Sequence, residues 1–87
     1  MKLKYNFTIN KLGDEYSASP SIENEFNGVI FLNETGKDIF ELLQKDTTID
    51  TIVEELSKKY TDDKTIIRLE VEKLINLLSN KNLMTGE

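Results

Sequence analysis

Few of the residues that could carry out chemistry are placed where catalysis would need them. The chain has no cysteine and no histidine, so it lacks the commonest transition-metal ligands and the commonest general base. None of the serines has an obvious activating base: Ser17, Ser19, Ser21, Ser57 and Ser79. The carboxylate pairs Glu54/Glu55 and Asp62/Asp63 fit a solvated helix face and a helix cap. We therefore expect no enzymatic activity and no cofactor.

The sequence does not indicate a site for phosphate, metal or nucleic acid either. The glycines lie too far apart to form a phosphate-binding loop: Gly13, Gly28, Gly36 and Gly86. No segment has the spaced Asp and Asn residues, closed by a Glu, that a calcium loop requires. The formal net charge of −5 argues against the basic face of a nucleic-acid-binding protein.

The length of 87 residues predicts a single domain, residues 1–87, with a thin hydrophobic core. No apolar stretch is long enough to span a membrane. The N-terminal residues Met1-Lys2-Leu3-Lys4 also lack the apolar run of a signal peptide. We expect a cytoplasmic protein without a membrane partner.

The N-terminal third predicts three strands. Residues 2–10 alternate between apolar and polar side chains, which indicates one strand with a buried face. The pair Gly13-Asp14 is typical of a two-residue hairpin turn, and residues 15–19 predict the returning strand. Pro20 ends that strand because it cannot donate a ladder hydrogen bond. The apolar run 29–32 predicts the third strand.

Three helices should follow, over residues 34–45, 49–60 and 64–80. Their expected N-caps are Asn33, then Thr47 or Thr48, then Asp62 or Asp63. After the third helix, Leu83 and Met84 should fold back onto the core. The predicted fold class is α+β, a winged helix-turn-helix with a three-stranded antiparallel N-terminal sheet followed by three helices.

The third helix is apolar over a wider arc than one core requires. At 100° per residue its core stripe consists of Ile67, Val71, Leu74, Ile75 and Leu78. Ile66 and Leu77 lie roughly 100° to one side, with Glu70 and Lys73 near them. Either these two residues pack under the sheet or the N-terminal strand, or they form a second apolar surface that is open to a partner.

The third strand, Val29 to Leu32, has no charge and no proline. An edge strand of this kind can accept an extended peptide as an added strand. Alternatively, the run is simply part of the core, and its edge is covered by the 21–27 loop or by a crossing helix. The residues alone leave both interpretations open.

Residues 27–36 read Asn-Gly-Val-Ile-Phe-Leu-Asn-Glu-Thr-Gly, followed by Ile39 and the pair Leu42-Leu43. This pattern resembles the PqqD-like family, known as RiPP recognition elements, whose signature is a strand ending in Leu-Asn-x-Thr-Gly before a helix. Residues 48–60 and 70–83 resemble the second and third helices of that family. The chain departs from the family pattern at Glu70, where an aspartate is usual, and at Asn82, where a glycine is common.

The resemblance implies a protein that binds the leader of a ribosomally made precursor peptide. The leader would add to the third strand, in a groove closed by the third helix. A separate modifying enzyme would then receive it, such as a radical S-adenosylmethionine (SAM) enzyme, a leader peptidase or a cyclodehydratase. The residues that we expect to contact the peptide are Val29, Ile30, Phe31, Leu32, Ile66, Ile67, Glu70, Lys73, Leu74 and Leu77.

Three rival interpretations can be weighed on the residues. A winged-helix nucleic-acid-binding protein would need exposed Arg and Lys, but the second and third helices mix both signs of charge. A carrier protein would need an Asp-Ser pair at a helix start, which the sequence lacks. A structural subunit could form a homodimer through the open sheet edge.

Overall fold

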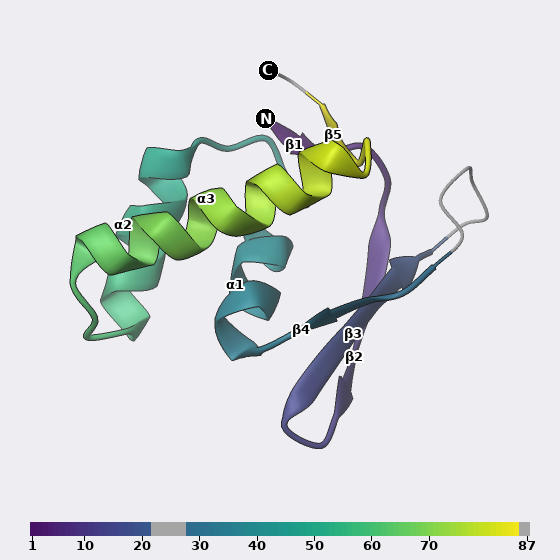
Figure 1. Cartoon of the computed structure of the whole chain (residues 1–87), viewed down its shortest axis with the longest axis horizontal. Helices are drawn as coiled ribbons and strands as arrows, with labels where there is room; N and C mark the ends of the chain where they lie inside the picture. The colour runs from purple at the N-terminus through teal and green to yellow at the C-terminus, as the bar shows by residue number, and fades with distance from the viewer. Residues whose placement is uncertain (22–27, 86–87) are drawn as a thin grey trace.

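The computed structural model describes residues 1–21 and 28–85. A three-stranded sheet lies at one side of the molecule and the helices lie at the other (Figure 1). The described elements, in chain order, are β1 (Lys2–Leu3), β2 (Phe7–Leu12), β3 (Glu15–Pro20), β4 (Ile30–Leu32), α1 (Glu34–Leu42), α2 (Ile49–Lys59), α3 (Lys64–Asn80) and β5 (Met84–Thr85). The predicted α+β class, with an antiparallel N-terminal sheet followed by three helices, is confirmed.

The single strand predicted over residues 2–10 is wrong, because the structure divides it between two sheets. β2 belongs to the sheet β2-β3-β4, whereas β1 pairs with β5 at the other end of the chain. Leu3 lies opposite Met84 in that pairing, and the Leu3 amide donates to the carbonyl of Leu43 at 2.8 Å. The apolar alternation continues across the break because Leu3 and Phe7 are buried in the same core.

The predicted hairpin between β2 and β3 is confirmed. Leu12 and Glu15 are paired across the two-residue turn, and Gly13 has φ 64°. A positive φ at the first turn residue is typical of a type II′ turn, which favours glycine there. The returning strand continues one residue beyond the prediction, to Pro20, which lies opposite Phe7.

Side-chain caps begin each helix where the sequence predicts. The Asn33 side chain accepts a hydrogen bond from the Gly36 amide at 2.8 Å, and Thr48 accepts one from the Thr51 amide at 3.1 Å. Asp63, rather than Asp62, caps α3. The first helix ends at Leu42, three residues before the predicted end.

The end of α3 depends on Asn82, which adopts φ 60°. Asparagine tolerates this left-handed conformation better than most residues, so the chain can turn back. The Leu83 amide then donates to the carbonyl of Leu78 at 2.9 Å. Leu83 and Met84 are buried, which confirms that they fold back onto the core.

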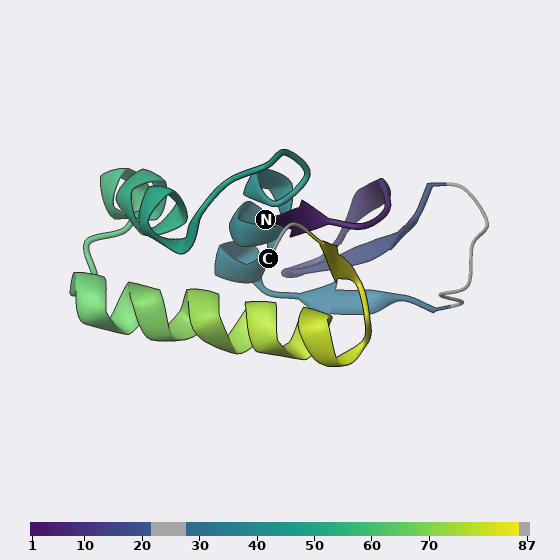
Figure 2. The same cartoon turned by 90° about the horizontal axis from the view of Figure 1, so that it is seen from above.

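The helices and the sheet share one hydrophobic core. At its centre the rings of Phe7 and Phe40 meet edge to face, with their centroids 5.0 Å apart. Seen from above, α3 runs along the length of the molecule past α2, α1 and β4 (Figure 2). In the part of the chain that is described, no helix is long and apolar enough to cross a bilayer.

An ion cluster joins α1 to the end of α2. The Asp38 carboxylate accepts hydrogen bonds from the ammonium of Lys37 at 2.7 Å, the ammonium of Lys59 at 2.9 Å and the hydroxyl of Tyr60 at 2.5 Å. Burial raises the pKa of Asp38, but these hydrogen bonds outweigh the burial and leave its pKa below the ordinary value. The cluster fixes α1, whose other face contributes to the site described next.

Candidate functional site

A groove of about 260 Å³ lies between β4 and α3, with part of α1 as its floor. In both views α3 passes alongside β4 (Figures 1 and 2). The residues that line the groove come from all three elements: Phe31, Leu32, Asn33, Gly36, Ile39, Glu70, Lys73, Leu74 and Leu77. Most of these side chains are apolar, while Glu70 and Lys73 bring charge to the α3 side.

The edge of β4 that is not paired with β3 has no strand partner within residues 1–21 and 28–85. The alternative of a cover by the 21–27 loop falls on residues 22–27, which lie outside the described residues. Antiparallel pairs alternate between hydrogen-bonded and non-hydrogen-bonded, and the pair that closes a two-residue hairpin is hydrogen-bonded. Counting from Leu12 and Glu15, the hydrogen-bonded pairs between β3 and β4 are Tyr16 with Leu32 and Ala18 with Ile30. The backbone N–H and C=O of Phe31 therefore point away from β3, toward the open edge.

The side chains around β4 alternate between the core and solvent. Ile30 and Leu32 are each 6% exposed, whereas Phe31 is 65% exposed and Val29 is 49% exposed. Leu32 still lines the groove, but Ile30 does not. Since the backbone of Ile30 is also turned toward β3, this residue supports the edge from within the core.

On α3 the predicted residues separate into three groups. Glu70, Lys73, Leu74 and Leu77 line the groove. Ile67 is 3% exposed and packs in the core, so its side chain does not reach the groove, because it lies on the core stripe of the helix. Ile66 is 54% exposed but does not line the groove. The alternative that Ile66 and Leu77 pack under the sheet is wrong, because about half of each side chain is exposed, 54% and 45%.

Sequence reasoning missed the contribution of α1. Asn33, Gly36 and Ile39 line the floor of the groove. The signal available was Gly36, a costly residue inside a helix. A Cβ at this position would lie 3.2 Å from the Asn33 side-chain oxygen and 3.3 Å from Leu32 Cδ2. The glycine thus lets the first turn of α1 approach the end of β4.

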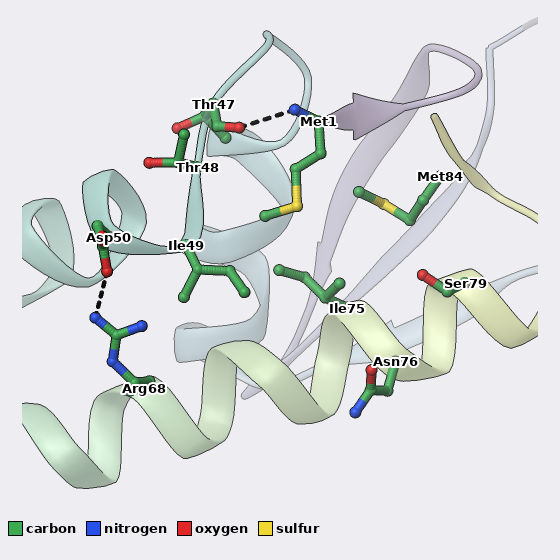
Figure 3. Close-up of a pocket in the computed structure, with 10 residues that line it drawn as sticks. All are labelled: Met1, Thr47, Thr48, Ile49, Asp50, Arg68, Ile75, Asn76, Ser79 and Met84. Carbon is green, nitrogen blue, oxygen red and sulfur yellow. Dashed lines mark hydrogen bonds and ion pairs between the residues drawn. The ribbon is translucent and has the colours of Figure 1, made fainter. Parts of the chain in front are cut away.

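A second, larger hollow of about 670 Å³ lies on another side of α3, between that helix, the start of α2 and the chain's first residue. Figure 3 shows Arg68 of α3 directed toward Asp50 of α2, with which it forms an ion pair. The hydrogen bond to Asp50 raises the pKa of Arg68. None of the predicted peptide contacts lines this hollow. Within the described residues, no group of His, Cys, Asp or Glu side chains could hold a metal ion.

Comparison with known proteins identifies the family. The family model "Coenzyme PQQ synthesis protein D (PqqD)" matches residues 22–84, so the chain belongs to the PqqD family. Proteins of this family are non-catalytic binding domains. No curated protein matches the sequence.

One solved structure has the same fold over the whole chain. It is described as TbiB1 in complex with the TbiA(beta) leader peptide, and it superposes with a TM-score of 0.76. The match covers 100% of this chain and 98% of that chain, at 21% sequence identity. At this identity the likeness shows a shared fold.

Proposed function

We propose that this domain binds the leader segment of a ribosomally made precursor peptide as an added strand on β4. The observation that carries the proposal is the edge of β4 that no described strand pairs with, which faces a groove walled by α3 in a PqqD-family fold. TbiB1, which shares this fold, has been solved with a leader peptide. The domain itself would perform no chemistry and hold no cofactor.

Binding would work by capturing an extended chain. A free leader of this kind is disordered and loses conformational entropy when it docks. Backbone pairing at Phe31, whose N–H and C=O point to the open edge, offsets part of that loss. Apolar leader side chains would then be buried against Ile39, Leu74 and Leu77, each contributing roughly 1.5–3 kcal/mol if it is fully removed from water.

The captured leader would be presented to a separate modifying enzyme. Holding the leader close to that enzyme raises the effective concentration of the attached core peptide. A radical SAM enzyme is the partner that we favour, with a leader peptidase or a cyclodehydratase as the other classes. Val29 and Ile66 would extend the apolar contact beyond the groove, since both are about half exposed.

The nucleic-acid alternative gains no support from the arrangement of charges. Arg68 is engaged with Asp50, and Lys64 with Glu54. Both cations therefore form ion pairs with carboxylates of α2 at the start of α3, where a recognition helix would need free positive charge.

Amide chemical-shift changes would test the proposal directly. The isotope-labelled domain would be titrated with a synthetic leader from a precursor gene encoded nearby. Saturable shifts should cluster on residues 28–33 and 64–78, with the largest at Phe31. Shifts that cluster instead around Asp50, Arg68 and Asn76 would move the binding site to the second hollow. If no shifts occur at high peptide concentration and sedimentation shows a dimer, the structural-subunit interpretation replaces the proposal.

A further inference from the structure

The charged side chains along the groove side of α3 are not used within the fold. Ion pairs elsewhere engage Lys37, Lys59 and Lys64. By contrast, Glu70, Lys73 and Lys81 form no ion pair with any residue in 1–21 or 28–85, although all of them are exposed. These charges remain available to a ligand.

These charges are also ordered along the helix. Lys81 follows Glu70 by eleven residues, which is close to three turns of about 3.6 residues, so both lie on the same side of α3. The Lys4 ammonium donates to the side-chain oxygen of Asn82 at 3.0 Å, which brings a second cation to the C-terminal end of α3. The N-terminal end of the groove side therefore carries both Glu70 and Lys73, whereas its C-terminal end carries the cation Lys81.

A strand added to β4 would run past these charges in a defined direction. β4 leads into α1, and in both views it runs opposite to α3 (Figures 1 and 2). Every strand pair described in this domain is antiparallel, and antiparallel pairing is slightly more stable per residue than parallel pairing. An added antiparallel strand would run parallel to α3, with its N-terminal part near Glu70 and its C-terminal part near Lys81.

We infer that the groove prefers a peptide with an acidic residue on the C-terminal side of an apolar anchor residue, an inference that rests on the proposed function. Leu74 and Lys81 are seven residues apart, or about 10 Å at about 1.5 Å per helical residue. A strand covers that distance in about three residues, at about 3.3 Å each, and its side chains alternate in direction. The preferred ligand is thus a leader segment with Asp or Glu two or four residues after the anchor.

Selection from a random library of twelve-residue peptides displayed on phage would test this order. The unmodified domain should enrich an apolar anchor followed by Asp or Glu. The Lys81→Glu domain should instead enrich Lys or Arg at those positions. Lys11→Glu is the matched control, because it makes the same charge change at an exposed site on β2 and should leave the selected pattern unchanged.

Synthetic peptides would then measure how much Lys81 contributes to peptide affinity. Lys81→Glu should weaken a peptide with acidic residues after its anchor by about three- to tenfold in fluorescence anisotropy, because it replaces an exposed attraction with a repulsion. A peptide with the two flanks exchanged should bind the unmodified domain more weakly by a similar factor.

Two outcomes separate the inference from the proposed function. If the Lys81→Glu and unmodified domains enrich the same charge order, the inference is overturned and strand addition still stands. If Leu77→Asp also enriches the same peptides as the unmodified domain, binding does not use the groove, and the proposed function fails together with the inference.

Discussion

The Asp38 carboxylate accepts a hydrogen bond from the Tyr60 hydroxyl at 2.5 Å, which links α1 to the C-cap residue of α2. The Asp38 side chain is only 12% exposed, so its charge depends on this hydroxyl and on the ammonium groups of Lys37 and Lys59. Burial and the neighbouring carboxylate together raise the pKa of Tyr60. The two residues therefore connect α1 to the end of α2.

Removing the hydrogen bonds to Asp38 should destabilise the domain. We expect Asp38→Ala to lower the free energy of unfolding by about 1–3 kcal/mol, because the Tyr60 hydroxyl and the Lys37 ammonium lose a partly buried acceptor. Urea denaturation followed by circular dichroism would measure the change. Tyr60→Phe should cost less, about 1 kcal/mol, and Asp62→Ala, at an exposed position, should cost little. Equal losses in Asp38→Ala and Asp62→Ala would contradict the proposed role of the cluster.

Acid should weaken the same hydrogen bonds, because it protonates the Asp38 carboxylate. The folded pKa of Asp38 lies below its ordinary value of 3.8, so the folded state holds the charged form more strongly than the unfolded chain does. This contribution to stability is complete above the ordinary pKa and is lost as the pH falls through the folded pKa. Melting temperatures measured from pH 7 to pH 2 should therefore drop less steeply for Asp38→Asn than for the unmodified domain. Parallel curves would show that Asp38 is not a source of the acid sensitivity.

Leu77 offers a way to block the groove without unfolding the domain. It lines the groove and is 45% exposed, so Leu77→Asp removes an apolar contact and places a charge where a peptide would be buried. We expect leader affinity to fall at least tenfold, with a melting temperature close to that of the unmodified domain. Leu12→Asp is the control, because Leu12 is a similarly exposed leucine, 55%, on β2. A similar loss of affinity in both variants would remove the groove as the binding site.

The left-handed conformation of Asn82 makes a further stability test. Replacing it with glycine should raise the free energy of unfolding by up to about 1 kcal/mol, whereas Asn82→Ala should lower it by about 1 kcal/mol. Asn80→Ala is the control, because Asn80 ends α3 in an ordinary helical position. Thermal unfolding of the three variants would rank them, and an alanine variant as stable as the glycine variant would contradict the argument from φ.

The sequence predicted the helices well, because their periodicity and their caps are local signals. Asn33, Thr48 and Asp63 each cap a helix within two or three residues of themselves. The N-terminal strand could not be divided correctly, because β1 is defined by its pairing with Met84 at the far end of the chain. No alternation within residues 2–10 carries that information.

The same distinction explains what was found and missed in the candidate site. A helical wheel is sufficient to place Glu70, Lys73 and Leu77 on one side of α3. Asn33 and Gly36 contribute only because α3 crosses over the start of α1, and this crossing is a tertiary arrangement. The exposure of Phe31, in turn, follows from the register between β3 and β4.

The position of α3 beside the edge of β4 that no described strand pairs with has a consequence for which molecules can use that edge. A free sheet edge normally invites the edges of other folded proteins, and such pairing leads to aggregation. Here α3 lies beside the edge across a groove of about 260 Å³, so a folded sheet that approached β4 would have to clear this helix. The edge of β4 would thus be accessible to a flexible, extended segment and much less accessible to the sheet edges of folded proteins.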